Sequence, residues 1–295
     1  MKYGARNQIK GRVKSQSLKV ENVPNSNSRK KEALLIYAGV DIGSLVTKCV
    51  LLENGNILSW SIVDSRSDPE RAAEEALGIA LSKAHTTRED VACTVATGYG
   101  RIALPAVDKT VTELTCHGRG AHYLCPETRT VIDIGGQDSK VLRLDEQGNM
   151  IEFAMNDKCA AGTGRFLEVM AHALEIELDQ LGAFSLQSNS PVSLSNTCAV
   201  FAETEVISLL ASKRRKEDIA AGIHMSIAGR VGNMAKSFGV KRDLMMVGGV
   251  AKNIGVRKAL ENFLQIEFVH MDTDPQITGA LGAALLAKDF FERRR

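Results

Sequence analysis

The sequence VDIGS at residues 40–44 recurs as IDIGG at residues 132–136. Each copy consists of an apolar residue, an aspartate, a second apolar residue and a glycine-containing turn, and each ends a strand-like apolar run. Repetition of one supersecondary pattern within a chain indicates internal duplication. We therefore expect an α/β protein with two similar domains, each of which opens with a strand that carries an aspartate near its end.

The residues around each copy predict similar strands. The first copy closes the run LLIYAGVDIG and leads into TKCVLLENG and ILSWSIVDS, a three-stranded antiparallel opening. The second starts at Arg129, and the turn DEQGN separates the two alternating runs that follow. A helix is expected from about Asp68, because Asp-Pro opens it, acids follow and a lysine comes late. We expect residues 33–129 and 275–292 to form domain I, residues 130–274 domain II, and residues 1–32 a basic disordered tail.

Length and composition are typical of a globular protein. With 295 residues, 44% hydrophobic and 24% charged, the chain can bury a substantial core. We expect a cytoplasmic protein without a membrane partner, because no apolar stretch is long enough to span a bilayer and no signal-peptide core follows the start. The first 31 residues carry nine Lys or Arg and one acid, Glu21. This tail favours a solvated extension or a contact with an acidic partner over nucleic-acid binding.

The repeated turns have a chemical use. Glycines expose backbone N–H groups to phosphate, and an aspartate at a strand end can hold hydrated Mg²⁺. Asp41 and Asp133 are therefore our candidates for the magnesium shell. The candidates for contacts to phosphate oxygens are Gly43, Ser44, Thr47, Lys48, Gly135 and Gly136.

Two further groups of residues complete the expected nucleotide site. Gln137 and Asp138 are candidates for positioning the attacking water, because phosphoryl transfer depends on placement and charge compensation. In MMVGGVAKNIGV, Gly248 and Gly249 follow a strand and Asn253 stands at a helix start. These three residues are expected to form a flat surface for adenosine.

Two of the six cysteines stand out by their surroundings. Cys159 lies in MNDKCAAGTGRF and Cys198 in LSNTCAVFAETEVI, and we expect both at helix starts, where the helix dipole favours a thiolate. A 4Fe-4S cluster usually takes four thiolates, so a symmetric dimer would supply the other two. Taken alone, without the rest of the sequence, the two residues favour buried structural thiols over cluster ligands. Cys49 and Cys93 lie in alternating apolar runs and are predicted to be core residues.

Six motifs in order carry a resemblance to known proteins. They are TGYGR at residues 97–101, TELTCH at 112–117, IDIGGQDSK, MNDKCAAGTGRF, CAVFAETEVISL and GGVAKN. The arrangement resembles the actin, Hsp70 and sugar-kinase superfamily. Within it, the motifs are similar to those of the ATP-dependent activators of 2-hydroxyacyl-CoA dehydratases, together with the ATPase subunits of benzoyl-CoA reductases and the reductases of double-cubane-cluster proteins. The similarity covers residues 34–288.

This resemblance implies a homodimer in which Cys159 and Cys198 of each chain hold one shared 4Fe-4S cluster. It places ATP and magnesium in a cleft between the two domains. Reduced ferredoxin or flavodoxin would supply one electron, and the acceptor would be a 2-hydroxyacyl-CoA dehydratase, a benzoyl-CoA reductase or a double-cubane protein. A small-molecule kinase and an actin-like scaffold are the alternatives from other functional classes, and neither needs the cysteines.

Overall fold

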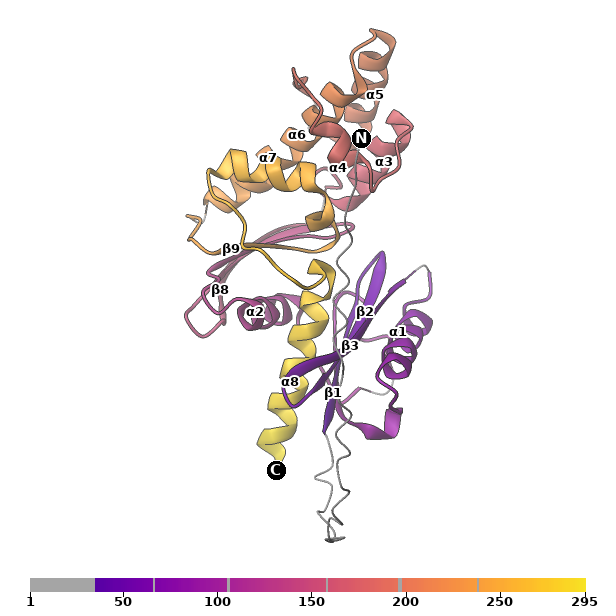
Figure 1. The fold of residues 1–295 in the computed structure, drawn as a ribbon, viewed down its shortest axis with the longest axis vertical. Coiled ribbons are helices and arrows are strands. Elements are labelled where there is room, and N and C mark those ends of the chain that lie inside the picture. Colours follow the sequence, from indigo (N-terminus) through magenta and orange to yellow (C-terminus); the bar gives the residue numbers. More distant parts are fainter. Residues whose placement is uncertain (1–34, 66, 105–106, 158, 196–197, 238) are drawn as a thin grey trace, which may run out of the picture. The chain divides into compact units, whose positions relative to one another are not determined.

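A computed structural model of the chain describes residues 35–295 with gaps at 66, 105–106, 158, 196–197 and 238. The described residues belong to one unit, Leu34–Arg295, which contains two sheets (Figure 1). The predicted tail, residues 1–32, lies outside the described residues. The division of the rest into domains I and II stays a prediction. Among the described helices, none combines the length and the apolar character needed to cross a bilayer.

The first sheet has the strand order β3-β2-β1-β4-β5. Its strand β1 pairs antiparallel with β2 and parallel with β4, and β2 pairs antiparallel with β3, so the predicted antiparallel opening is confirmed. The elements are β1 Ile36–Ile42, β2 Val46–Glu53, β3 Asn56–Asp64, α1 Pro69–Lys83, the 3-10 helix Arg88–Asp90, β4 Val91–Thr97, β5 Lys109–Thr110 and α2 Glu113–Leu124.

The predicted start of α1 is also confirmed. The Asp68 carboxylate accepts a hydrogen bond from the Arg71 N–H, and Pro69 is the first helical residue. An aspartate at this position satisfies one of the N–H groups that a helix start leaves without a partner.

Alternate residues of β1 pack on opposite faces of the first sheet, as the twofold period of a strand requires. Val40 and Ile42 belong to the core cluster that contains the buried alanines of α1. Tyr37 belongs to the cluster that contains α8, Thr278–Arg294. Both faces are therefore covered, and the predicted core positions of Cys49 and Cys93 are confirmed by exposures of 0% and 3%.

The second sheet repeats this topology around β6. Its order is β8-β7-β6-β9, with β6 antiparallel to β7 and parallel to β9. Strand β6 thus occupies the place that β1 has in the first sheet. The elements are β6 Thr130–Ile134, β7 Ser139–Leu144, β8 Met150–Asn156, α3 Gly164–Leu174, α4 Leu181–Ser185, α5 Ala199–Ala211, α6 Lys216–Ser237, β9 Leu244–Val247, the 3-10 helix Gly249–Lys252, α7 Ile254–Leu264 and the 3-10 helix Pro275–Ile277.

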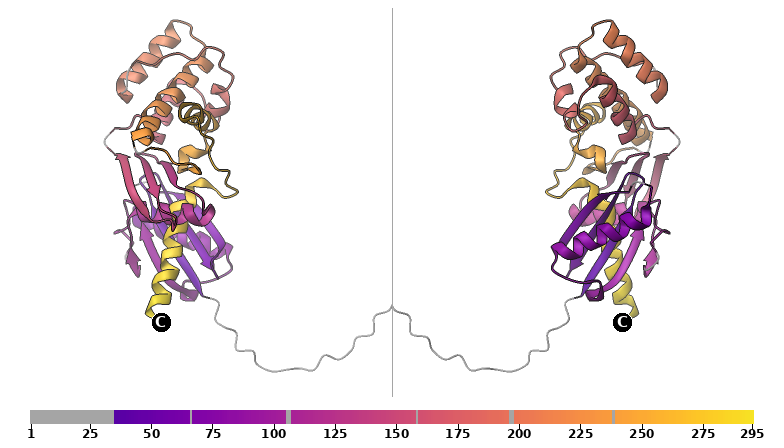
Figure 2. Two further views of the ribbon diagram at one scale, coloured as in Figure 1. Left: turned by 90° about the vertical axis from the view of Figure 1, so that its left-hand side faces the viewer. Right: turned by 90° about the vertical axis from the view of Figure 1, so that its right-hand side faces the viewer.

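The two faces of the second sheet pack against different helices. Ile132, Ile134 and Val141 share one core cluster with the buried residues of α3, α5, α6 and α7. Val131 and Leu142 face the other way and pack with Ala121 of α2. Figure 2 shows the helices α3 to α7 grouped on one side of this sheet, with the yellow helix α8 on the other.

Helices α2 and α8 pack against each other at unusually close range. A Cβ atom added to Gly120 would lie 2.1 Å from the Thr278 carbonyl oxygen, and one added to Gly282 would lie 1.8 Å from the Cys116 carbonyl oxygen. Only glycine fits at such distances. These two contacts hold the N-terminal halves of α2 and α8 against each other.

Candidate functional site

The same tight turn follows β1 and β6. After β1, the Gly43 N–H donates to the Val46 carbonyl at 3.2 Å, and after β6, the Gly135 N–H donates to the Asp138 carbonyl at 3.0 Å. The two turns approach each other, because a Cβ atom added to Gly136 would lie 2.4 Å from a methyl carbon of Leu45. The duplication predicted from the sequence therefore brings two backbone N–H turns to one place.

The duplication extends to a buried ion pair in each sheet. Asp41 lies opposite Lys48 in the β1–β2 register, and Asp133 lies opposite Lys140 in the β6–β7 register. Lys48 Nζ is 3.1 Å from Asp41 Oδ2, and Lys140 Nζ is 3.5 Å from Asp133 Oδ2. Each predicted magnesium-shell aspartate thus has a lysine beside it.

Lys140 is the centre of the larger of the two ion-pair groups. Besides Asp133, its ammonium contacts Asp138 at 2.6 Å and Glu113 at 3.6 Å. Burial disfavours the charged amine, but these three carboxylates outweigh it and hold the pKa of Lys140 above its ordinary value. Burial likewise opposes ionisation of Asp133, but His117, Lys140 and Lys48 prevail and hold its pKa below the usual range.

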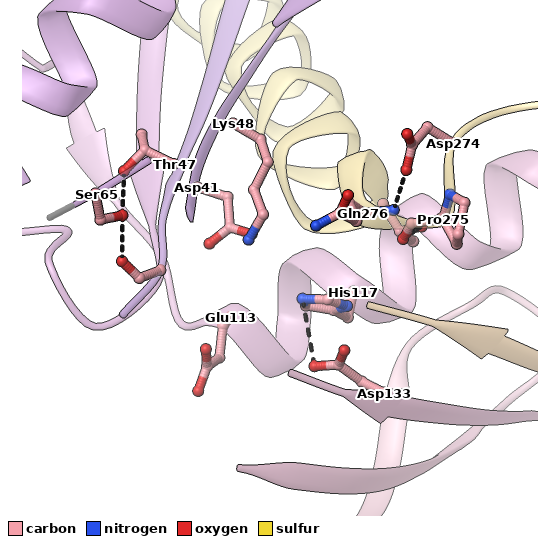
Figure 3. Close-up of polar contacts among 12 residues, drawn as sticks. Asp41, Thr47, Lys48, Ser65, Glu113, His117, Asp133, Asp274, Pro275 and Gln276 are labelled. Atoms are coloured by element: carbon pink, nitrogen blue, oxygen red, sulfur yellow. Dashed lines mark hydrogen bonds and ion pairs between the residues drawn. The ribbon is translucent and has the colours of Figure 1, made fainter. Parts of the chain in front are cut away.

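Glu113, the first residue of α2, reaches the same group from a different element. Burial raises the pKa of its carboxyl, and the Lys140 ammonium offsets this only in part. One turn further along α2, His117 Nε2 lies 3.7 Å from Asp133 Oδ2 (Figure 3). The N-terminal half of α2 therefore presents a carboxyl group and an imidazole next to the second phosphate turn.

Two equivalent glycines pack directly against the carboxylates of Asp41 and Asp133. Gly98 follows β4 and Gly248 follows β9, with φ of +86° and +84°. A Cβ atom on Gly98 would lie 2.6 Å from Asp41 Oδ1, and one on Gly248 would lie 2.4 Å from Asp133 Oδ1. Both the positive φ and the lack of space exclude larger residues.

The helix start predicted at Asn253 is confirmed. The Asn253 side chain caps α7 by accepting hydrogen bonds from the N–H groups of Gly255 and Val256. Beside it, Lys252 pairs with Asp274 at 2.5 Å and donates to Gln276 at 2.8 Å. These contacts tie the Gly249–Lys252 turn to the residues that lead into α8.

Residues of the two phosphate turns, of the start of α2 and of the Gly249–Lys252 turn line one cavity of 980 Å³. Its size and its mixture of backbone N–H groups, lysines and carboxylates suit a nucleoside triphosphate with a metal ion. The predicted residues in its lining are Asp41, Gly43, Ser44, Lys48, Asp133, Gly135, Gly136, Asp138, Gly248, Gly249 and Asn253. The structure thus brings together most of the predicted site, and the individual roles of these residues stay predictions.

Two predicted residues are absent from the described lining of this cavity. The Thr47 hydroxyl is buried and shares a hydrogen bond of 2.8 Å with Ser65, whose hydroxyl donates to the Gly43 carbonyl (Figure 3). Thr47 faces away from the cavity because alternate residues of β2 point to opposite sides of the sheet. Gln137 is exposed at the tip of the second turn. Thr47 therefore supports the turn rather than contributing its hydroxyl to the cavity wall.

Among the residues of the cavity wall that were not predicted from the sequence are Lys140, Glu113 and His117, which surround Asp133 and Asp138. Lys140 had a usable signal, because it follows Asp133 at the same spacing at which Lys48 follows Asp41. Glu113 and His117 lie in the quoted motif TELTCH, but their proximity to Asp133 depends on how α2 packs.

The expectation that Cys159 stands at a helix start is wrong. Helix α3 begins at Gly164 with Thr163 as its N-cap, and Cys159 lies in the loop before it. The loop closes on itself, because the Thr163 N–H and hydroxyl both donate to the Ala160 carbonyl. The Asn156 side chain donates to the Cys159 carbonyl at 2.9 Å and fixes the loop to the end of β8.

Cys198 does stand at a helix start, as the N-cap residue of α5, and its side chain is exposed. Cys159 is half-buried, whereas Cys49, Cys93 and Cys116 are buried. The half-buried thiol of Cys159 and the exposed thiol of Cys198 would supply two of the four thiolates that a 4Fe-4S cluster usually takes. Within the part of the chain that the structure describes, no group of three or more His, Cys, Asp or Glu side chains is arranged to hold a metal ion.

The second phosphate turn is hydrogen-bonded directly to the start of α3. The Gly164 N–H donates to the Gly135 carbonyl at 2.8 Å, and the Arg165 N–H donates to the Gly136 carbonyl at 2.9 Å. The loop that carries Cys159 is therefore anchored at one end by Asn156 and at the other by the phosphate turn. A displacement of that turn would act on the start of α3 through these hydrogen bonds and so on the loop that precedes it.

Comparison with known proteins agrees with this geometry. The sequence profile of the BadF/BadG/BcrA/BcrD ATPase family matches residues 38–287. The (R)-2-hydroxyglutaryl-CoA dehydratase activating ATPase of Acidaminococcus fermentans is 49% identical over 256 residues, which are 84% of this chain and 95% of that protein.

Solved structures show the same similarity. The activator of the 2-hydroxyisocaproyl-CoA dehydratase from Clostridium difficile, with bound ADPNP, superposes with a TM-score of 0.84 and 47% identity over 88% of this chain and 96% of that one. A putative N-acetylglucosamine kinase of Chromobacterium violaceum, at 15% identity and a TM-score of 0.52 over 87% of this chain and 100% of that one, shares the fold alone. The fold expected from the sequence and the resemblance to dehydratase activators are thereby confirmed.

Proposed function

Because the chain belongs to the BadF/BadG/BcrA/BcrD ATPase family, we propose that it is an ATP-hydrolysing iron-sulfur reductase that delivers single low-potential electrons to a partner enzyme. The relatives named above favour a 2-hydroxyacyl-CoA dehydratase as the acceptor. A benzoyl-CoA reductase or a double-cubane protein is the next candidate. Reduced ferredoxin or flavodoxin is the proposed electron donor, and the cytoplasm the proposed location.

The observation that carries this proposal is the pair of hydrogen bonds from the start of α3 to Gly135 and Gly136. A nucleotide whose phosphates lie on that turn contacts the same short segment that leads back to Cys159. Coupling between nucleotide state and a distant group needs such a physical connection and a differential interaction in the two states.

The residues of the cavity have distinct proposed tasks. Lys48 and the N–H groups of the two turns bind phosphate oxygens, while Asp41 and Asp133 hold a hydrated magnesium ion. Asp138 pairs with Lys140 at 2.6 Å and keeps that ammonium in place. Glu113 is a further candidate for orienting the attacking water, alongside Asp138 and Gln137, because it is a carboxylate of the cavity wall on a rigid helix.

The proposed cluster site requires two copies of the chain. Cys159 and Cys198 are the only thiols that the described residues place outside the core, apart from the half-buried Cys125. A 4Fe-4S cluster bound by four such thiolates supplies a one-electron redox couple. Val200 and Phe201 follow Cys198 and are 68% and 62% exposed, an apolar surface that suits a contact between the two copies.

Anaerobic reconstitution tests the proposal. We expect a brown homodimer with about four irons per two chains. Cys159→Ser should lose the cluster and retain ATP binding, because the cysteine loop lies outside the cavity. Cys125→Ser is the matched control and should load iron normally. A colourless monomer after reconstitution, or full electron transfer by Cys159→Ser, would refute the proposal.

A further inference from the structure

We propose that Arg230 sets the reduction potential of the 4Fe-4S cluster by donating a hydrogen bond to the Cys159 sulfur. This inference rests on the proposed function above and assigns to it a positioning residue that lies outside both cysteine motifs. Arg230 belongs to α6 and is separated from Cys159 by 71 positions in the sequence. The position of the Arg230 guanidinium, the path of its aliphatic stem and the structure of the Cys159 loop support this role.

The guanidinium points at the thiol. Arg230 Nη1 lies 3.6 Å from Cys159 Sγ, within hydrogen-bonding range for sulfur. Both side chains are half-buried, so bulk water screens the interaction only in part. Arginine stays charged at every accessible pH and presents its N–H groups in a rigid plane, which suits a fixed charge beside a thiolate.

The stem of Arg230 reaches the thiol by crossing the loop at Gly162. A Cβ atom added to Gly162 would lie 3.0 Å from Arg230 Cδ and 3.8 Å from the Val231 side chain. Any larger residue would push the stem away. The glycine of the sequence CAAGTG therefore makes room for the arginine as well as for the turn.

The loop holds Cys159 in place for this contact. Asn156 fixes its carbonyl from one side, and the Thr163 hydroxyl closes the turn at Ala160 from the other. The two cysteines differ in what stabilises their negative charge. Cys198 is the N-cap of α5 and lies within reach of that helix's dipole, which acts mainly on the first turn. Cys159 precedes Thr163, the N-cap of α3, and lies outside the first turn of α3. Arg230 provides at Cys159 the positive charge that the start of α5 provides at Cys198.

The consequence for redox chemistry follows from charge. Reduction adds one electron and therefore one negative charge to the cluster and its thiolates. A fixed guanidinium stabilises the reduced form more than the oxidised form, and hydrogen bonds to ligand sulfurs act in the same direction. Arg230 should therefore keep the potential high enough for a one-electron donor to load the cluster.

The test compares three variants of the reconstituted dimer by a dithionite titration followed by electron paramagnetic resonance. Arg230→Met removes the charge and the N–H donors, and Arg230→Gln removes the charge but keeps an amide. Arg215→Met is the matched control, because Arg215 pairs with Glu217 at the other end of α6 and its loss changes the net charge equally. Nucleotide binding is measured in parallel to establish that each protein is folded.

Arg230→Met should favour the oxidised form about tenfold or more relative to the wild type, which lowers the potential by about 59 mV or more for a one-electron couple. Arg230→Gln should shift it in the same direction, and Arg215→Met should not shift it. A wild-type potential in either cluster-loaded Arg230 variant would overturn the assignment. If the wild-type chain takes up no cluster, the proposed function itself would be refuted.

Discussion

Replacing Lys140 by methionine tests the ion-pair group at the second phosphate turn. The substitution keeps the length of the side chain but leaves Asp133, Asp138 and Glu113 without the ammonium that lies 2.6–3.6 Å from them. Removing one partner of a buried ion pair costs about 3–5 kcal/mol, because the remaining charge is buried without compensation. We expect a loss of this size in the free energy of unfolding at neutral pH.

The duplication provides the matched control. Lys48 occupies the equivalent position in the first sheet but pairs with one carboxylate, Asp41, and its side chain is 13% exposed against 3% for Lys140. Lys48→Met leaves a single carboxylate, Asp41, without its hydrogen bond, which costs about 1–3 kcal/mol. Lys48→Met should therefore destabilise the protein by less than Lys140→Met.

Thermal and urea unfolding of the nucleotide-free, metal-free protein, followed by circular dichroism, measure both values. The difference between the wild type and Lys140→Met should shrink on acidification. The pKa of Glu113 is already above its ordinary value of 4.5, and removing the ammonium would raise it further. In Lys140→Met, Glu113 therefore takes up a proton at a pH above 4.5. Once the carboxyl is neutral, the free-energy cost of burying its charge disappears. Equal losses in the two variants, or a Lys140→Met protein as stable as the wild type at neutral pH, would refute this account.

Two further substitutions test the cavity. Glu113→Gln should lower the rate of ATP hydrolysis about a hundredfold or more while nucleotide binding persists, because the amide cannot accept a proton from water; unchanged turnover would exclude Glu113. In the wild type, hydrolysis should decline on acidification at a pH above 4.5, since the pKa of Glu113 is raised and the ionised form is needed. Gly248→Ala should lower the free energy of unfolding by about 1–3 kcal/mol, because φ is +84° and the new Cβ would meet Asp133. Gly78→Ala, at a helix position with no atom within 4 Å of the new Cβ, should stabilise the protein by up to about 1 kcal/mol, and a similar gain at Gly248 would contradict the geometry.

The interpretation of the turns from the sequence succeeded where local chemistry decides the structure. A strand that ends in Asp-Ile-Gly has few conformations open to it, and so has an Asn that precedes a helix. Both repeated turns and the Asn253 cap form as predicted. Family and fold were likewise accessible, since the ordered motifs are specific. Thr47 and Gln137 lie outside the described cavity lining, because the sequence shows which residues lie near a turn and does not show which way each side chain points.

By itself, the sequence determined the duplicated α/β fold, the family and the positions of the two phosphate turns, because these depend on periodicity and on short motifs. Only the tertiary structure decided which charges meet. Lys140 contacts Glu113 because α2 packs beside the second sheet, and Arg230 contacts Cys159 because α6 passes over Gly162. Such pairs join elements far apart in the chain, and their distances are set by the packing of helices on sheets, which no local pattern encodes.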